Sequence, residues 1–224
     1  MSTDYLKTLR ENVPNFLESI YGKIICDFGC GFGNEAITMA KVGAKVIVGY
    51  DPHVRSLNQA ICNAVGIKNV KFTDNLPDSL FDIVISQNAM EHFPDPVETI
   101  RIMKGLLKEN GYLIITFGPP WFAPYGSHMN YFIPIPWANL IFPEWLIMKW
   151  RSLYRSDGAR RYEEVEMGLN KMTVKKFERI IKDSGLEITF LKKNCSWGLN
   201  FFVNIPIIRE LFINHITVVL RKGE

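Results

Sequence analysis

Apolar residues in the first half of the chain come in short runs, separated by longer segments of helical periodicity. Each run is bounded by turn-forming residues and has the length of a buried strand. The five runs are Ile24–Phe28, Lys45–Gly49, Val70–Phe72, Phe81–Ser86 and Tyr112–Phe117. Strands that alternate with helices predict a parallel sheet covered by helices on both faces.

The helices between these strands carry start and stop signals. Asp51 precedes Pro52 and is a candidate N-cap of one helix, and Asp95-Pro96-Val97-Glu98 has the form of a capping box. Glycines follow the expected helix ends, and Asn110-Gly111 is expected to separate the third helix from the fifth strand. The expected helices are Asn34–Val42, Pro52 to about Gly66, and Pro96 to about Lys108.

The alternation stops after residue 117. Residues 118–170, the first insertion, are rich in proline and aromatic residues and lack a clean period. A helix over Thr173–Ser184 and strands over Leu186–Leu191 and Ile216–Leu220 are then expected, with a second insertion, residues 194–215, between the two strands. We therefore predict an α/β fold with a doubly wound, mostly parallel seven-stranded sheet and aromatic-rich insertions after strands 5 and 6.

Composition indicates a globular protein and gives little support to nucleic-acid binding. Of the 224 residues 47% are hydrophobic and 22% are charged, and the formal net charge is +3. Because lysine and arginine are scattered along the chain, no nucleic-acid surface is expected.

Cysteine usage and the N-terminal segment predict a cytoplasmic protein. Cys26, Cys30, Cys62 and Cys195 form no CxxC pair, so we expect neither structural zinc nor a disulfide framework. The N-terminal segment lacks the apolar run of a signal peptide, and no stretch of about 18 apolar residues predicts a membrane-spanning helix.

A glycine-rich turn follows the first strand. Residues 27–34 read D-F-G-C-G-F-G-N, and glycine lets a backbone approach a ligand closely. A dinucleotide site would need a third glycine where Asn34 stands, and Asp27 would lie beside its pyrophosphate. A cofactor with a cationic amine and no phosphate tolerates Asp27 better. Asp51 ends the second strand, where a carboxylate can bind ribose hydroxyls, although it could also serve only as a helix cap.

Taken together, these motifs resemble those of class I S-adenosylmethionine-dependent methyltransferases. IICDFGCGFG resembles the first motif of that family, and VIVGYD its second-strand acid motif. FTDNLPDSLFDIVISQNAMEHFPDP and ENGYLIITF resemble the third to fifth strands of the type 11 methyltransferase subgroup. The resemblance covers about residues 20–120 and implies the Rossmann-like methyltransferase fold, with S-adenosylmethionine as cofactor and S-adenosylhomocysteine as product.

The resemblance also implies where the cofactor binds. The backbone of the glycine turn would line the methionine part, Asp27 would hold the amino group, and Asp51 would bind the ribose. Residues after the second and third strands would border the adenine, with Asp74 accepting from its exocyclic amine, and Gln87 would lie near the sulfonium. The implied set is Asp27, Gly29, Cys30, Gly31, Gly33, Asp51, Pro52, His53, Asp74, Asn75 and Gln87.

Two histidines are candidates for a general base. His92 follows the fourth strand, close to the expected methyl group, and His128 lies among aromatic residues of the first insertion. A purely structural role, and catalysis by proximity alone, remain alternatives for both. No metal site is expected.

We expect a single domain over residues 1–224. Residues 1–22 would form an N-terminal helical cap, 23–117 the cofactor-binding half, and the two insertions the acceptor side. The aromatic residues of the insertions indicate either core packing or a surface for a hydrophobic or lipid-linked acceptor, with at most peripheral membrane contact. The basic residues 149–161 would pair with Glu163, Glu164 and Glu166, or meet anionic groups of that acceptor.

The predicted activity is methyl transfer to a small-molecule, lipid or sugar acceptor, with oxygen favoured. The alternative is a pseudoenzyme that keeps the fold and the cofactor without turnover. A nicotinamide-dependent reductase is disfavoured by Asn34 and by the lack of a Tyr-x-x-x-Lys pair. The sequence SQNAMEH after the fourth strand lacks the Pro-Pro motif of amino-directed nucleic-acid enzymes. The oligomeric state is left open.

Overall fold

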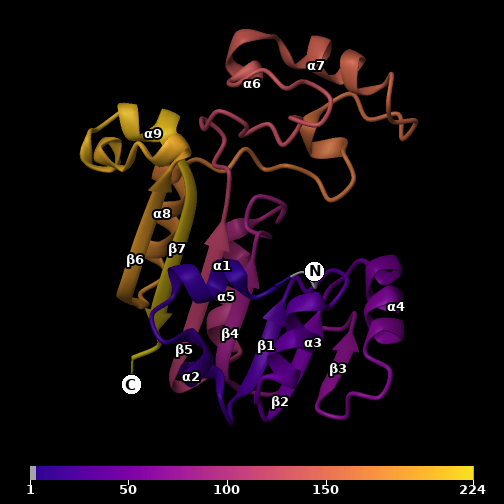
Figure 1. The fold of residues 1–224 in the computed structure, drawn as a ribbon, viewed down its shortest axis with the longest axis vertical. Coiled ribbons are helices and arrows are strands. Elements are labelled where there is room, and N and C mark those ends of the chain that lie inside the picture. Colours follow the sequence, from indigo (N-terminus) through magenta and orange to yellow (C-terminus); the bar gives the residue numbers. More distant parts are fainter. Residues whose placement is uncertain (1–3, 224) are drawn as a thin grey trace.

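The computed structural model describes residues 4–223 as a seven-stranded sheet with helices on both faces (Figure 1). The strand order is β3-β2-β1-β4-β5-β7-β6, and only β7 runs antiparallel to its neighbours. The predicted doubly wound, mostly parallel sheet is therefore confirmed. The strands are β1 Ile24–Phe28, β2 Val46–Tyr50, β3 Val70–Thr73, β4 Phe81–Gln87, β5 Leu107–Phe117, β6 Glu187–Cys195 and β7 Ile213–Arg221.

Two apolar clusters hold helices to the two faces of the sheet. One face is covered by α1, α2 and α3, whose buried side chains, such as Leu9, Phe16 and Met39, pack with Ile25 and Ile114 of the strands. The other face is covered by α5 and α8. The bounds are α1 Lys7–Asn12, α2 Phe16–Ile20, α3 Asn34–Lys41, α4 Val54–Asn63, α5 Pro96–Gly105 and α8 Val174–Asp183.

The order of the strands fixes where a ligand can bind. β1 lies between β2 and β4, and the chain winds outward from β1 in both directions. In open α/β sheets, ligands occupy the crevice beyond the carboxyl ends of the strands at such a switch point. The turns after β1, β2 and β4 all lie at this edge.

Several element boundaries differ from the prediction. α5 ends at Gly105, and β5 begins at Leu107 and continues through Asn110-Gly111, which we expected to be a stop. Leu107 pairs with Phe81 ahead of a register shift in β4, so this early part of β5 is set by its neighbour. β6 and β7 are also longer than expected, because they pair with each other along most of their length.

The helix caps agree in part with the sequence analysis. Asp95 accepts hydrogen bonds from the backbone N–H groups of Val97 and Glu98, as expected for an N-cap. The reciprocal bond of a capping box is not formed, because Glu98 pairs with Arg101. The prediction that Asp51 caps the next helix was wrong: α4 begins at Val54 with His53 at its N-cap position.

The first insertion forms a layer beyond the carboxyl ends of β4 and β5 (Figure 1). It contains α6 (Ala138–Ile141), α7 (Glu144–Arg151) and a 3-10 turn over Tyr162–Glu164. Its own apolar cluster includes Met129, Ile147 and Tyr162, and Trp121 packs edge to face on Tyr162 with ring centroids 4.8 Å apart. Core packing therefore accounts for part of its aromatic content.

Other large apolar side chains of the two insertions are exposed. The exposed fractions are 64% for Trp145, 65% for Phe201 and 82% for Ile207. Among residues 4–223, no helix combines the length and the apolar character needed to span a membrane.

The basic segment of the first insertion pairs differently from the prediction. Arg151 is buried and binds Asp157 with two bonds of 2.6 Å, and Glu163 pairs instead with Lys171. The expected side-chain pairing of residues 149–161 with Glu163, Glu164 and Glu166 is not found among the ion pairs of the described chain.

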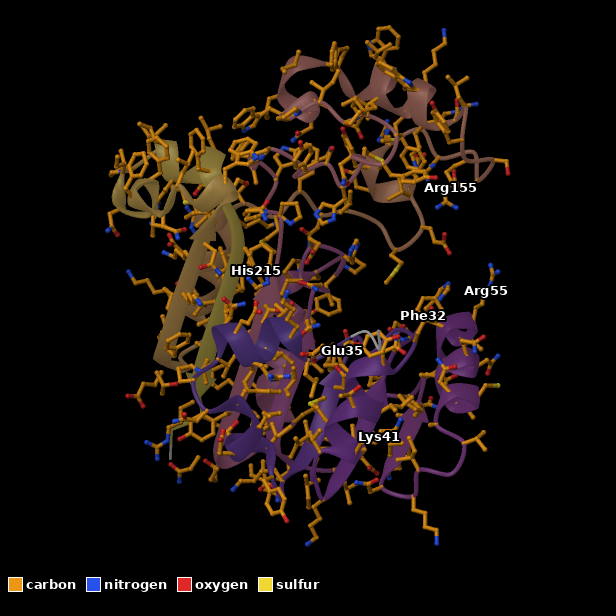
Figure 2. The ribbon with its side chains drawn as sticks, in the orientation of Figure 1. Phe32, Glu35, Lys41, Arg55, Arg155 and His215 are labelled. Atoms are coloured by element: carbon orange, nitrogen blue, oxygen red, sulfur yellow. The ribbon has the colours of Figure 1, made fainter. Side chains whose placement is uncertain are left out.

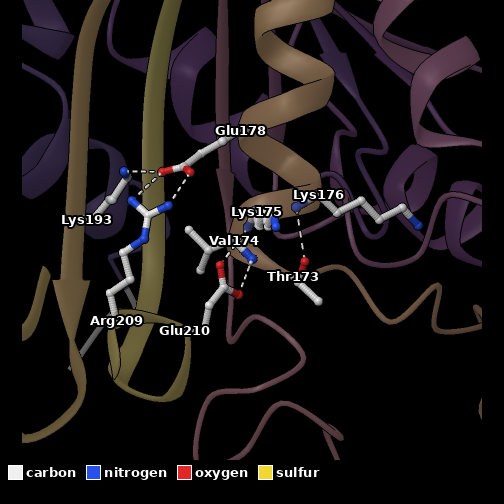
Figure 3. A network of polar contacts seen from close by, with 8 residues as sticks. All are labelled: Thr173, Val174, Lys175, Lys176, Glu178, Lys193, Arg209 and Glu210. Atoms are coloured by element: carbon white, nitrogen blue, oxygen red, sulfur yellow. Dashed lines mark hydrogen bonds and ion pairs between the residues drawn. The ribbon is translucent and has the colours of Figure 1, made fainter. Parts of the chain in front are cut away.

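The second insertion is fastened to α8 by a polar network (Figure 3). It contains two 3-10 turns, Ser196–Gly198 and Asn200–Asn204, and α9, Ile208–Phe212. Glu210 of α9 accepts hydrogen bonds from the N–H groups of Val174 and Lys175, at the start of α8. Glu178 of α8 binds both Arg209 of α9 and Lys193 of β6.

Candidate functional site

The glycine turn joins β1 to α3 at the carboxyl edge of the sheet. Gly29, Gly31 and Gly33 have φ angles of 81°, 50° and 74°, a region that glycine occupies without strain. The N–H groups of Gly29 and Cys30 donate to the carbonyl of Tyr50, at 2.8 and 3.1 Å. A Cβ on Gly31 would meet no atom within 4 Å, so the backbone there is open to a ligand.

Asp51 lies directly after β2 and organises this turn. One carboxylate oxygen accepts from the N–H of Gly31 and the other from the N–H of His53, both at 2.8 Å. The side chain is buried. Each carboxylate oxygen has two lone pairs, so each keeps one for a ligand hydroxyl.

Acidic side chains surround the start of α3. Asp27 is buried, and burial, followed by the charges of Glu35 and Asp51, raises its pKa well above the ordinary value. Burial also raises the pKa of Glu35, which accepts a hydrogen bond of 3.0 Å from Gln87. Figure 2 shows Glu35 and Phe32 on the side of the sheet that faces the first insertion. Sequence reasoning did not single out Glu35, although an acid in the first turn after a glycine turn is a readable signal.

These residues suit a cationic nucleoside better than a phosphate ligand. Asp27 Oδ2 and Gln87 Oε1 are buried and have no hydrogen-bond partner among the described residues. Buried acceptors without a partner are stabilised by a hydrogen-bond donor or a positive charge, whereas these acidic side chains would repel a phosphate. S-adenosylmethionine carries both an ammonium and a sulfonium, so the residues present fit that cofactor.

The four residues expected at the adenine lie after β2 and β3, which are neighbours. The N–H of Asp51 donates to Thr73 at 3.2 Å, which brings the ends of these strands together. Pro52, Asp74 and Asn75 are exposed. His53 Nδ1 lies 2.8 Å from Ser56 Oγ, and the amide of Asn75 donates to Asp74 at 2.9 Å.

The loop after β4 links the glycine turn to the first insertion. A Cβ on Gly29 would lie 3.1 Å from the side chain of Ala89 and 3.6 Å from the ring of Phe93. The side-chain amide of Asn170 donates to the carbonyls of Met90 and Phe93, at 2.7 and 2.8 Å. The insertion therefore holds residues 89–93 in place above the sheet edge.

The structure brings the two candidate histidines together. The rings of His92 and His128 meet edge to face with centroids 5.8 Å apart. Burial lowers the pKa of His128 to about 4, although its hydrogen bond to Pro119 opposes the shift. Both histidines border a cavity of about 200 Å³ that is lined by His92, His128, Met129, Phe132, Arg151, Arg155, Val165, Glu166 and Leu169.

Two further groups near this edge were not singled out from the sequence as site residues. Glu91 is 3% exposed, and burial raises its pKa to about 7. His215 lies on β7, its buried Nε2 has no hydrogen-bond partner in the described part of the chain, and its Cα would lie 3.0 Å from a Cβ on Gly118. Its place depends on the pairing of β5 with β7, which no local motif encodes.

Comparison with known proteins supports the family. A family model described as a methyltransferase domain matches residues 2–190. The ubiquinone biosynthesis O-methyltransferase of Vibrio vulnificus is 32% identical over 107 residues, 44% of this chain and 45% of that protein. The phosphoethanolamine N-methyltransferase 3 of Arabidopsis thaliana is 31% identical over 123 residues, 52% of this chain and 25% of that protein. The matches thus span less than half the length of these curated relatives.

A solved structure agrees with the fold over nearly the whole chain. An S-adenosylmethionine-dependent methyltransferase from Mesorhizobium loti superposes with a TM-score of 0.60 and 15% identity, covering 96% of each chain. At that identity the likeness concerns the fold alone. With the family match over residues 2–190, the chain belongs to the class I S-adenosylmethionine-dependent methyltransferases.

Proposed function

We propose that the chain transfers the methyl group of S-adenosylmethionine to an oxygen of a small, hydrophobic or lipid-linked acceptor. The observation that carries this proposal is the pairing of His92 with His128 beside a cavity at the cofactor edge of the sheet. An oxygen acceptor must lose a proton, and this cavity offers nitrogen and carboxylate groups that can take it. The relatives include both an O-methyltransferase and an N-methyltransferase, so the choice of oxygen rests on the cavity.

The cofactor contacts in this proposal follow the geometry of the glycine turn. The open backbone at Gly31 would face the methionine part, and the unpaired oxygen of Asp27 would accept from its ammonium. Asp51 would accept from the ribose hydroxyls with its remaining lone pairs. The other proposed contacts are Gly29, Cys30, Gly33, Pro52, His53, Asp74, Asn75 and Gln87.

Positioning is the main contribution expected of the protein. Bound S-adenosylmethionine supplies a methyl group on a sulfonium, which is already an excellent leaving group. The residues around the cavity would hold the acceptor oxygen close to that methyl group, and a neighbouring base would take the proton that the oxygen loses. Burial keeps the His128 ring neutral, so it can accept a hydrogen bond from the acceptor hydroxyl, although a pKa lowered to about 4 makes it a weak base.

A hydrophobic acceptor is supported by the apolar surface beside the cavity. Phe132 lines the cavity, and Arg155 lies 5.9 Å over its ring. Figure 2 shows Arg155 on the side of the first insertion that faces the sheet. An aromatic ring with an arginine beside it suits an acceptor that combines an apolar body with an anionic or phenolic group.

The test uses methyl-labelled S-adenosylmethionine with two acceptors. A prenylated dihydroxybenzene offers phenolic oxygens on an apolar tail, and phosphoethanolamine offers an amine. We expect label in the phenol and a lower kcat for His128→Gln, with unchanged binding of S-adenosylhomocysteine. Label in the amine alone would contradict the oxygen assignment. Binding of S-adenosylhomocysteine without transfer to either compound would count against the proposed acceptor class.

A further inference from the structure

Three potential metal ligands converge where His92 and His128 border the cavity, and the third, Glu91, lies behind them in the protein. Glu91 and His92 come from the loop after β4, and His128 comes from the first insertion. One ligand atom from each side chain lies within 4.8 Å of the others. The cluster therefore joins two segments that the fold brings together.

The hydrogen bonds of the two histidines leave one lone pair free on each ring. His92 Nδ1 lies 2.7 Å from the carbonyl of Gly168, and His128 Nε2 lies 3.1 Å from that of Pro119. A carbonyl oxygen can only accept, so these two nitrogens carry the hydrogen. In neutral rings, His92 Nε2 and His128 Nδ1 are then acceptors. Metal-binding histidines are commonly oriented in this way by a backbone carbonyl.

Glu91 supplies the third acceptor. Its side chain is buried, and its Oε2 has no hydrogen-bond partner among the described residues. A buried carboxylate oxygen without a donor is costly, and a cation would relieve that cost. The three side chains thus offer two free imidazole nitrogens and one unpaired carboxylate oxygen to a cation.

The neighbouring arginines do not supply the positive charge beside Glu91. Arg151 is held by two hydrogen bonds to Asp157, and Arg155 lies over the ring of Phe132. Neither is paired with Glu91 among the ion pairs described.

We propose that Glu91, His92 and His128 bind one divalent transition-metal ion, of which Zn²⁺ is the best match. Two imidazoles and a carboxylate form a common ligand set for Zn²⁺ and for other first-row divalent metals. Metal–ligand bonds of about 2.1 Å would separate tetrahedral ligand atoms by about 3.4 Å. The three side chains would therefore move together by up to about 1.4 Å on binding.

A metal ion at this site would have a specific role in the proposed methyl transfer. Three protein ligands leave a fourth position for water or an acceptor oxygen. A bound ion would lower the pKa of a hydroxyl at that position, so no histidine would need to take its proton. This consequence rests on the proposed function, whereas metal binding itself does not.

The test titrates chelator-treated protein with ZnCl₂ by calorimetry and with CoCl₂ by visible absorption. We expect one ion per chain and the absorption bands of low-coordinate Co²⁺. Glu91→Gln, His92→Gln and His128→Gln should each weaken Zn²⁺ binding by at least about tenfold, the lower end of the effect seen when only supporting residues are removed. His215→Gln is the matched control, because it removes a histidine that lies outside both the cluster and the proposed cofactor contacts.

The outcomes separate this site from the proposed function. Circular dichroism and thermal melting identify any variant that fails to fold, and Glu91→Gln keeps the size and shape of the buried side chain. No Zn²⁺ binding by the wild type, or equal binding by all three folded variants, would overturn the site. Binding of S-adenosylhomocysteine is measured in the same samples and should not change. A chain that binds Zn²⁺ but not S-adenosylhomocysteine would retain the metal site and refute the cofactor contacts.

Discussion

Asp51 accepts a hydrogen bond of 2.8 Å from the backbone N–H of Gly31, twenty residues earlier in the chain. The carboxylate proposed to bind the ribose therefore also shapes the turn proposed to bind the methionine part. Its second oxygen accepts from the N–H of His53, so the same side chain also holds the turn that precedes α4. One residue thus couples the two halves of the proposed cofactor site before any ligand arrives.

Replacing Asp51 should remove cofactor binding more completely than the loss of one ligand contact. Asp51→Ala should weaken the binding of S-adenosylhomocysteine by at least roughly ten- to hundredfold, the range for hydrogen bonds to a charged group. Calorimetric titration measures the effect. Asp78→Ala, at an exposed position between β3 and β4, is the control and should bind normally. Equal affinity of the two variants would remove Asp51 from the site.

Gly118 is required by the pairing of β5 with β7. A Cβ at this position would lie 2.2 Å from the carbonyl oxygen of Asn214 and 3.0 Å from the Cα of His215. Backbone atoms in a sheet cannot move aside cheaply, so Gly118→Ala should lower the free energy of unfolding by about 1–3 kcal/mol or more. Urea denaturation measures the change.

Gly105 is the control for Gly118, because a side chain at position 105 would not clash with its surroundings. It ends α5, and a Cβ there would meet no atom within 4 Å. Gly105→Ala should leave stability unchanged or raise it by about 0.5–1 kcal/mol, since alanine is the better helix former. Similar losses for both variants would show that the clash at Gly118 is not the cause.

The cofactor half of the fold could be predicted because its signals are local. The first strand, the glycine turn and Asp51 lie within residues 24–51, and each has its own pattern of apolar, glycine or acidic positions. The start of β5 could not be predicted in this way. Lys108 to Asn110 are polar, and only pairing of Leu107 with Phe81 makes this segment a strand.

The acceptor side depends on contacts between distant residues, which local patterns do not reveal. Asn170, 80 residues after Met90, donates to the Met90 carbonyl and so holds the loop that carries the buried Glu91. His92 and His128 were singled out separately from the sequence, but nothing in their spacing indicated that their rings would meet. Our expectation that no metal site exists followed from the absence of a compact ligand motif, and the proposed site is assembled from two segments instead.

Glu210 should stabilise α8 although it lies 36 residues from Val174. The side chain of Thr173 accepts from the N–H of Lys176, and Glu210 accepts from the N–H groups of Val174 and Lys175. Together they satisfy the free N–H groups in the first turn of α8 (Figure 3). Glu210→Ala should cost about 1 kcal/mol, the usual value for a lost N-terminal cap. Thermal melting measures the loss, and Glu187→Ala, at an exposed position of β6, is the control. Unchanged melting for Glu210→Ala would show that water replaces the carboxylate at no cost.

The pair of Arg151 and Asp157 should make the first insertion sensitive to acid. Hydrogen bonds from Arg151 lower the pKa of Asp157 to about 2, below the value of about 3.9 expected in an unfolded chain. Because the folded state holds the proton less tightly, the pair stabilises the fold above about pH 4, and this stabilisation is lost as the pH falls towards 2.

Melting temperatures of the wild type and of Asp157→Asn test the pair directly. The variant should melt at a lower temperature at pH 7, and the difference should shrink below pH 4 and become small near pH 2, where the wild-type carboxyl is about half protonated. Asp183→Asn, at an exposed position of α8, should show no such trend. A difference of the same size at pH 7 and pH 2 would mean that the variant loses packing around Arg151, whose side chain is only 7% exposed, and not the charge of Asp157.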